Sequence, residues 1–283
     1  MLDIGGRRLH FVRAGPEETT RPLVLLEAGA FGFSVDWAVV QARLAERGYA
    51  SLAYDRAGLG LSDPGPEPRD GAAIGADVEA LLERVAPKGS LILVGHSMAG
   101  LHVHRLAARN RHRVAGLVLV DATTPASMQS KFVSAGVGQF NTLSRLAAWT
   151  AGAGLLRPLS GTPLGDRIGL DGEIGEEKRW AFADAEHNAW AAAEVSAWPS
   201  AARQALEAGE LDPRWPVAVI LAGPPEDRMG LKAMQLAPAR ESRFGRVEHV
   251  AGATHASILA GAHADVIVRG VDYVSDAAMR VEA

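Results

Sequence analysis

The sequence predicts an α/β protein with a mostly parallel sheet and a helical insertion. Up to Asp121, short apolar segments alternate with amphipathic ones, the pattern of a parallel sheet covered by helices on both faces. From Thr123 to about Pro213 the pattern changes to Ala-rich helical stretches broken by Gly and Pro, and strand-like segments then resume. We therefore predict a core domain of residues 1–124 and 214–283, with a helical cap inserted at 125–213.

The individual elements follow from local patterns. Residues 8–12 alternate weakly after the Gly5-Gly6 turn, which predicts an early antiparallel strand. A helix over 37–47 ends before Gly48, the residue type favoured just beyond a helix C-terminus. The other predicted helices of the core are 74–85, one ending near Arg109, and 265–273. Residues 23–26 form a continuous apolar run, as expected of a strand buried on both faces. The other predicted strands cover 50–54, 91–94, 114–120, 217–221 and 246–250.

The composition argues against several classes of function. The chain has 283 residues, of which 48% are hydrophobic, enough for a sizeable core. Lys and Arg number 29 against 33 Asp and Glu, and this net charge of −4 argues against a nucleic-acid partner. No apolar run suits a membrane span and the N-terminus lacks a signal-peptide pattern, so we expect a cytoplasmic protein. The chain has no Cys, and its nine His have no metal-site spacing, so no metal site is expected.

One short segment predicts a catalytic nucleophile. Residues 95–100 (GHSMAG) follow a buried strand and precede a helix, which is the context of a nucleophile elbow. The sharp turn strains the backbone at Ser97, so the residues two positions away, Gly95 and Ala99, must be small. The turn exposes the Ser97 hydroxyl at the carboxyl end of the sheet and directs the Met98 N–H at a developing oxyanion. The alternative is an ordinary loop at a strand–helix junction.

A serine hydroxyl is a weak nucleophile until a neighbouring base takes its proton. In this architecture the base lies on a loop after the last strands, and His255 follows the predicted strand 246–250 at such a place. His249 and His263 are better explained as solvated or packed side chains. Three further histidines lie too close to the elbow in sequence to be the base: His96, His102 and His104.

The carboxylate that would orient the base has two candidate positions. Asp121 ends the strand that follows the nucleophile helix, whereas Glu226 and Asp227 lie in the loop after the next strand. Both positions reach the same edge of the sheet. Asp121 could instead cap the following helix, and Glu226 and Asp227 could be a solvated charge cluster. These residues alone leave the choice open.

The second oxyanion donor is expected in the loop after strand 23–26, where the sequence is EAGAFG. Gly29 permits a close backbone approach, and the Ala30 N–H is the candidate donor. We interpret Glu27 as a buried carboxylate satisfied by backbone donors, because a direct catalytic role would bring negative charge near the oxyanion.

Four segments together resemble the α/β-hydrolase superfamily over nearly the whole chain. They are 28–31 (AGAF), 54–62 (YDRAGLGLS), 95–100 (GHSMAG) and 252–255 (GATH). The second is very specific to the superfamily, although it is structural. The resemblance implies an eight-stranded sheet, a helical cap after the sixth strand and hydrolysis without a cofactor.

The chain departs from the family pattern at two places. Ala28-Gly29 stands where the family has a His-Gly pair, and the usual acid loop after the seventh strand has the sequence GPPED, residues 223–227. A related branch of the family carries its acid after the sixth strand. That branch favours Asp121 as the acid.

These residues predict a serine hydrolase that cleaves a carboxylic ester or lactone of a small, mostly apolar substrate through an acyl-enzyme. Ser97 attacks the carbonyl, His255 transfers the proton, and the N–H groups of Ala30 and Met98 bind the oxyanion. A serine nucleophile argues against the dehalogenase and epoxide-hydrolase branches, which use Asp there. Two alternatives are a C–C bond hydrolase or lyase on the same fold and a non-enzymatic small-molecule receptor.

The predicted cap suggests two further features. Four of the six Trp residues lie in it, which fits an apolar pocket, although tryptophans also build helical cores. They are Trp149, Trp180, Trp190 and Trp198. The Ala-rich helices of the cap could also form the surface of a homodimer.

Overall fold

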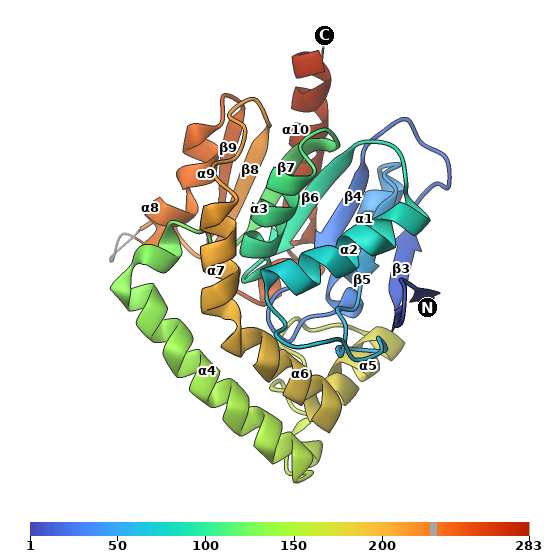
Figure 1. Ribbon diagram of the computed structural model, residues 1–283, viewed down its shortest axis with the longest axis vertical. Helices are drawn as coiled ribbons and strands as arrows, with labels where there is room; N and C mark the ends of the chain where they lie inside the picture. The colour runs from blue at the N-terminus through green and yellow to red at the C-terminus, as the bar shows by residue number, and fades with distance from the viewer. Residues whose placement is uncertain (227–230, 283) are drawn as a thin grey trace.

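A mostly parallel sheet forms the centre of the molecule (Figure 1). The structure, a computed structural model, describes residues 1–226 and 231–282. The strands of the sheet are β3 (Phe11–Ala14), β4 (Leu23–Glu27), β5 (Ser51–Tyr54), β6 (Leu91–His96), β7 (Val114–Val120), β8 (Val217–Ala222) and β9 (Gly245–Val250). Their order is β3-β5-β4-β6-β7-β8-β9, and β3 is antiparallel to β5 while the other neighbours are parallel. The predicted α/β class is confirmed.

Helices cover both faces of this sheet. The helices outside the segment between β7 and β8 are α1 (Ala38–Glu46), α2 (Gly71–Val85), α3 (Ala99–Arg109), α8 (Leu231–Gln235), α9 (Ala237–Glu241) and α10 (Ala264–Glu282). α1 and α10 pack on one face, and α2 and α3 pack on the other. Along β4, Val24 and Leu26 belong to the first of these cores and Leu25 to the second, which is why the strand is apolar throughout.

Two helices differ in length from the prediction. α2 begins at Gly71 rather than residue 74, because the Asp70 side chain accepts hydrogen bonds from the N–H groups of Ala72 and Ala73 and caps the helix. α10 continues past residue 273 because its apolar residues, among them Val274, stay on the buried face.

The number of strands needs a correction, since the resemblance implied eight and the main sheet of the described residues has seven. β1 (Leu2–Asp3) and β2 (Arg8–Leu9) form a separate two-stranded sheet. The Arg8 N–H donates to the Asp63 carboxylate at 2.8 Å, and the Arg8 carbonyl accepts from the Asp63 N–H at 2.9 Å. These bonds occupy backbone groups of β2, so the main sheet begins only at β3.

The segment between β7 and β8 is helical. It contains α4 (Lys131–Gly152), α5 (Gly172–Ala183), α6 (Ala185–Ser196) and α7 (Trp198–Glu207), with the short 3₁₀ turns η2 (Ser127–Gln129) and η3 (Arg157–Leu159). Figure 1 shows these helices gathered at one end of the sheet, with α4 along the outside. We propose that they form the predicted cap. Within the described ranges, no helix is long and apolar enough to cross a membrane.

Candidate active site

Ser97, His255 and Asp121 lie in a hydrogen-bonded row at the carboxyl end of the sheet. Ser97 follows β6 and Asp121 follows β7, while His255 lies in the loop after β9. The Ser97 Oγ is 2.9 Å from the His255 Nε2, and the His255 Nδ1 is 2.6 Å from the Asp121 Oδ2. With a neutral ring protonated on Nδ1, His255 donates to the carboxylate and accepts from the serine hydroxyl. The structure thus brings together the predicted nucleophile, base and preferred acid.

The backbone at Ser97 adopts the conformation of a nucleophile elbow. Its φ is +57°, in the left-handed region that a residue with a side chain rarely occupies. A Cβ on Gly95 would lie 3.0 Å from the Ala99 carbonyl oxygen, and a Cβ on Gly100 would lie 2.3 Å from that of Thr123. The two glycines therefore allow the tight turn from β6 into α3, and Ala99 is fully buried without disturbing it.

Asp121 is the carboxylate that meets His255. Its side chain is only 17% exposed, and its backbone is also left-handed, with φ +42°. Burial alone would raise the pKa of Asp121, but the hydrogen bond and charge of His255 outweigh burial and lower it. The carboxylate is therefore ionised at neutral pH.

The other predicted acids and the alternative role of Asp121 are not supported by the geometry. Glu226 is exposed and makes no hydrogen bond or ion pair with His255 among the described residues, and Asp227 lies outside them. Asp121 does not cap the next turn, because the Ser127 N–H there donates to the Thr124 Oγ1 instead.

The two predicted oxyanion donors lie beside Ser97. A Cβ on Gly29 would be 2.9 Å from the Ser97 Cβ, so only glycine allows this approach of the loop. In the described part of the chain, the N–H groups of Ala30 and Met98 have no hydrogen-bond acceptor. Both donors are thus free for a ligand oxygen.

Glu27 is buried as predicted, but its partners are side chains rather than the expected backbone donors. The Arg56 Nη1 donates to Glu27 at 2.8 Å, and the Tyr54 hydroxyl also donates to it. Arg56 also forms an ion pair with Glu194 of α6 at 2.9 Å. Burial alone would lower the pKa of Arg56, but the two carboxylates raise it well above its ordinary value. This buried charge cluster joins the helical segment to the sheet.

His96 makes a contact that the sequence does not predict. Its Nε2–H donates to the His255 carbonyl oxygen at 2.9 Å, and the two rings lie 4.7 Å apart. Burial, followed by the nearby His255, lowers the pKa of His96 to about 3, so the ring is neutral. His96 is therefore a positioning residue for the His255 loop. Its partner is a backbone atom 159 positions away, which no sequence motif signals.

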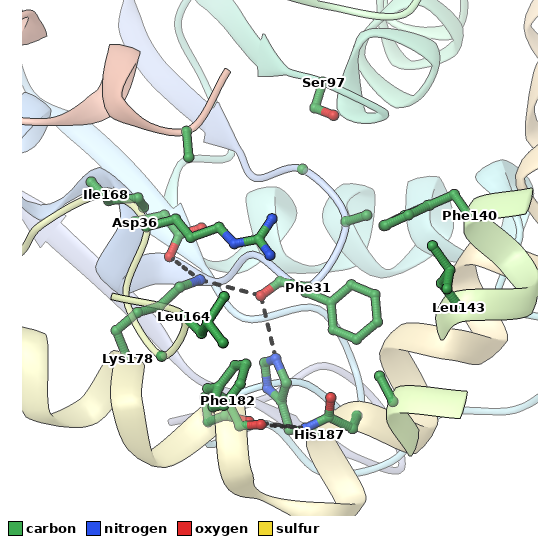
Figure 2. Close-up of a pocket in the computed structure, with 18 of the residues that line it drawn as sticks. Phe31, Asp36, Ser97, Phe140, Leu143, Leu164, Ile168, Lys178, Phe182 and His187 are labelled. Atoms are coloured by element: carbon green, nitrogen blue, oxygen red, sulfur yellow. Dashed lines mark hydrogen bonds and ion pairs between the residues drawn. The ribbon is translucent and has the colours of Figure 1, made fainter. Parts of the chain in front are cut away.

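A cavity of about 710 Å³ opens beside Ser97. In the view of Figure 2, Ser97 lies at one end of it, Phe182 and His187 lie at the other, and Phe31 lies between them. The apolar side chains that line it include Phe31, Phe140, Leu143, Ile168, Phe182 and Trp198. Such a lining suits a mostly apolar ligand.

The tryptophans of the helical segment contribute unequally to this cavity. Trp198 lines it, whereas the side chains of Trp149 and Trp180 are 66% and 45% exposed. Trp190 packs on Gly58, where a Cβ would lie 2.3 Å from the Trp190 Cγ. Of these four tryptophans, only Trp198 therefore lines the cavity. Trp190 packs against the core, as the alternative interpretation of the tryptophans expects, and Trp149 and Trp180 lie at the surface.

Two buried histidines should make the fold sensitive to acid. Burial is the main cause that lowers the pKa of His96 to about 3 and that of His187 to about 4. An unfolded His titrates near pH ~6.5, so between about pH 6.5 and 4 the unfolded state binds more protons than the folded state. The free energy of unfolding therefore decreases as the pH is lowered through this range. We expect a slope near pH 5 that approaches about 1.4 kcal/mol per pH unit for each histidine.

Urea unfolding at several pH values between neutral and mildly acidic measures this slope. His187→Gln should reduce it, whereas the same change at the exposed His112 should not. An unchanged slope in His187→Gln would contradict the prediction.

The comparisons with known proteins agree with this architecture. A family model described as alpha/beta hydrolase fold matches residues 22–160. A non-heme chloroperoxidase of Streptomyces lividans is 38% identical over 96 residues, which cover 34% of this chain and 34% of that protein. The chain spans half or less of the length of the curated relatives that it matches.

Solved structures are similar over nearly the whole chain. The enol-lactonase from Burkholderia xenovorans LB400 superposes with a TM-score of 0.67 at 20% identity, over 95% of this chain and 97% of that one. A putative epoxide hydrolase from Pseudomonas aeruginosa gives a TM-score of 0.73 at 20% identity, over 97% of this chain and 94% of the other. At this identity the likeness concerns the fold.

The fold and the site define an α/β hydrolase with its polar row at the carboxyl end of a parallel sheet. The chain has the α/β-hydrolase fold, and the family model of that description matches close to half of its length.

Proposed function

We propose that the protein is a serine hydrolase that cleaves a carboxylic ester or lactone through an acyl-enzyme. The observation that carries this proposal is the row Asp121–His255–Ser97, with 2.6 Å and 2.9 Å between its polar atoms. The left-handed Ser97 backbone and the two free N–H groups beside it support the same chemistry. The apolar cavity supports a mostly apolar substrate.

The reaction follows from the positions of these groups. The Ser97 Oγ attacks the substrate carbonyl while the His255 Nε2 takes the hydroxyl proton. The negative charge that develops on the carbonyl oxygen is stabilised by the N–H groups of Ala30 and Met98. His255 then gives its proton to the leaving alcohol, and the acyl group stays on Ser97. A water molecule, deprotonated by His255, releases the acid and restores the serine.

Labelling and turnover together test the proposal. A fluorophosphonate should label Ser97, and short 4-nitrophenyl esters should be hydrolysed over many turnovers. Labelling without ester turnover would instead favour a C–C bond hydrolase or lyase, or a receptor that retains the pocket. No labelling at all would contradict the proposal.

The charges on the cavity wall predict a preference among esters. Lys178 is paired with Asp36 at 2.6 Å, whereas Arg167, which also lines the cavity, has no ion pair or hydrogen bond from its side chain among the described residues. Because the rest of the lining is mostly apolar, we expect an acyl chain that is apolar except for a terminal carboxylate to be preferred over a neutral chain of similar length. Arg167→Gln should lower the ratio of the two kcat/KM values by about fivefold, the scale of a partly exposed ion pair.

The 4-nitrophenyl half-ester of glutaric acid and 4-nitrophenyl valerate provide the two substrates for this ratio. The matched control is Arg145→Gln, which removes the same charge from an exposed position on α4 outside the cavity lining. Equal ratios in the wild type, Arg167→Gln and Arg145→Gln would show that Arg167 does not select the substrate.

A further inference from the structure

The backbone of the oxyanion loop, residues 28–32, is fixed by side chains that bind its carbonyl oxygens. The Arg56 guanidinium donates to the Ala28 oxygen at 2.6 Å and to the Gly29 oxygen at 2.8 Å. The Gly29 carbonyl and the Ala30 N–H belong to one trans peptide group, so they point in opposite directions. The bond to Gly29 therefore sets the direction of the Ala30 N–H, the proposed oxyanion donor.

The next peptide group of the loop is fixed from the helical segment. The Phe31 carbonyl oxygen is 3.3 Å from the Lys178 Nζ of α5 and 3.3 Å from the His187 Nε2 of α6. Figure 2 shows both side chains directed at this oxygen. The Gly32 N–H, on the other side of the same peptide group, donates to the Gly29 carbonyl at 3.0 Å. Two consecutive hydrogen bonds therefore connect Lys178 and His187 to the peptide group of the Ala30 N–H. The first is their bond to the Phe31 oxygen, and the second is the bond from the Gly32 N–H to the Gly29 oxygen.

The loop requires such support because of its conformation. Phe31 has a φ of +60°, a left-handed conformation that is unfavourable for a residue with a bulky side chain. Such a conformation persists where surrounding contacts over-determine it. The two donors on the Phe31 carbonyl supply contacts of this kind.

Both donors are themselves fixed by the core. Lys178 forms an ion pair with Asp36 at 2.6 Å. The His187 Nδ1 accepts a hydrogen bond from the Gly60 N–H at 3.0 Å, which leaves the proton on Nε2, where it can be donated to Phe31. The His187 ring is buried and stays neutral. The positions of both donors are therefore set by contacts within the protein.

We propose that Lys178 and His187 are positioning residues that fix the oxyanion loop in its donor geometry, so that the helical segment completes the oxyanion hole as well as covering the cavity. This inference rests on the proposed serine hydrolase function. It implies that displacing α5 and α6 from the core weakens oxyanion binding without removing any group that touches the substrate carbonyl.

Kinetics with a transition-state analogue tests the proposal. A trifluoromethyl ketone forms a tetrahedral adduct with the serine, and its oxyanion occupies the hole. In Lys178→Met and in His187→Leu, kcat should fall by about 10- to 100-fold, less than the loss of about 10²–10³-fold on removing an oxyanion donor outright. The affinity for the ketone should fall by the same factor while KM changes little. Lys178→Arg should recover most of the activity, and Lys131→Met on α4 is the matched control.

A double variant separates the bond to Phe31 from the ion pair. Lys178→Met leaves the buried Asp36 carboxylate without its cation, which could disturb the fold by itself. Asp36→Asn combined with Lys178→Met removes both charges. The same loss of ketone affinity in the single and double variants supports the proposal, and recovery in the double variant would overturn the role of Lys178.

Amide hydrogen exchange provides a test that does not need activity. Exchange in a peptide covering residues 27–36 should be faster in Lys178→Met and His187→Leu than in the wild type or Lys131→Met. Unchanged exchange together with unchanged ketone affinity would overturn the inference. Absence of ester turnover and of labelling in the wild type would instead overturn the proposed function, while the exchange result would still decide whether these residues fix the loop.

Discussion

Replacing Ser97 with alanine is expected to lower kcat for a 4-nitrophenyl ester by about 10⁶-fold, the scale seen when a serine nucleophile is removed from a complete triad. The change removes the hydroxyl oxygen that the His255 Nε2 contacts, while the N–H groups of Ala30 and Met98 remain. Substrate binding and the oxyanion donors still give some catalysis in this variant, and this sets the lower limit of its kcat. Steady-state kinetics at saturating ester concentration measures the effect.

Two controls separate this loss from misfolding. The variant should unfold at the wild-type temperature, since a buried serine becomes only slightly smaller, and it should no longer be labelled by a fluorophosphonate. Ser134→Ala on α4, at an exposed position, should retain full activity and labelling. Full ester turnover in Ser97→Ala would reject the serine-hydrolase proposal.

Replacing Asp121 with asparagine is expected to lower kcat by about 10⁴-fold. The asparagine amide can donate to the His255 Nδ1, which would leave the ring proton on Nε2, where it cannot accept the proton of Ser97. The shape of the site is otherwise kept. The effect should appear in kcat with little change in KM, because Asp121 touches His255 and not the substrate.

Glu226→Gln is the matched control for this prediction. It removes one carboxylate from the loop after the neighbouring strand, at an exposed position that makes no contact with His255. We expect kcat within about twofold of the wild type, as for a surface substitution away from the site. A nearly normal rate in Asp121→Asn, or a large loss of rate in Glu226→Gln, would contradict the assignment of Asp121 as the acid.

The sequence alone does not distinguish Asp121 from Glu226 as the acid. Asp121 and Glu226 follow adjacent parallel strands, β7 and β8, so both start from the same edge of the sheet. Which carboxylate reaches His255 depends on how each loop leaves its strand. Asp121 turns at once into a left-handed conformation and points at the ring, whereas Glu226 remains exposed to solvent.

Features that depend on neighbouring residues can be predicted from the sequence alone. Uniformly apolar segments mark the strands buried on both faces, and the small residues around Ser97 mark the sharp turn from β6 into α3. Both signals are local, because a strand's burial pattern and a turn's steric needs involve residues only a few positions apart.

Features that join distant parts of the chain depend on the folded structure. Arg56 meets Glu194 across 138 positions, and the His96 ring meets a backbone oxygen of His255 across 159. The bonds from Lys178 and His187 to the Phe31 carbonyl are equally remote, and β2 leaves the main sheet because its backbone groups bond to Asp63. Such contacts leave no sequence pattern, because a backbone oxygen has the same chemistry in every residue and only folding brings its donor near.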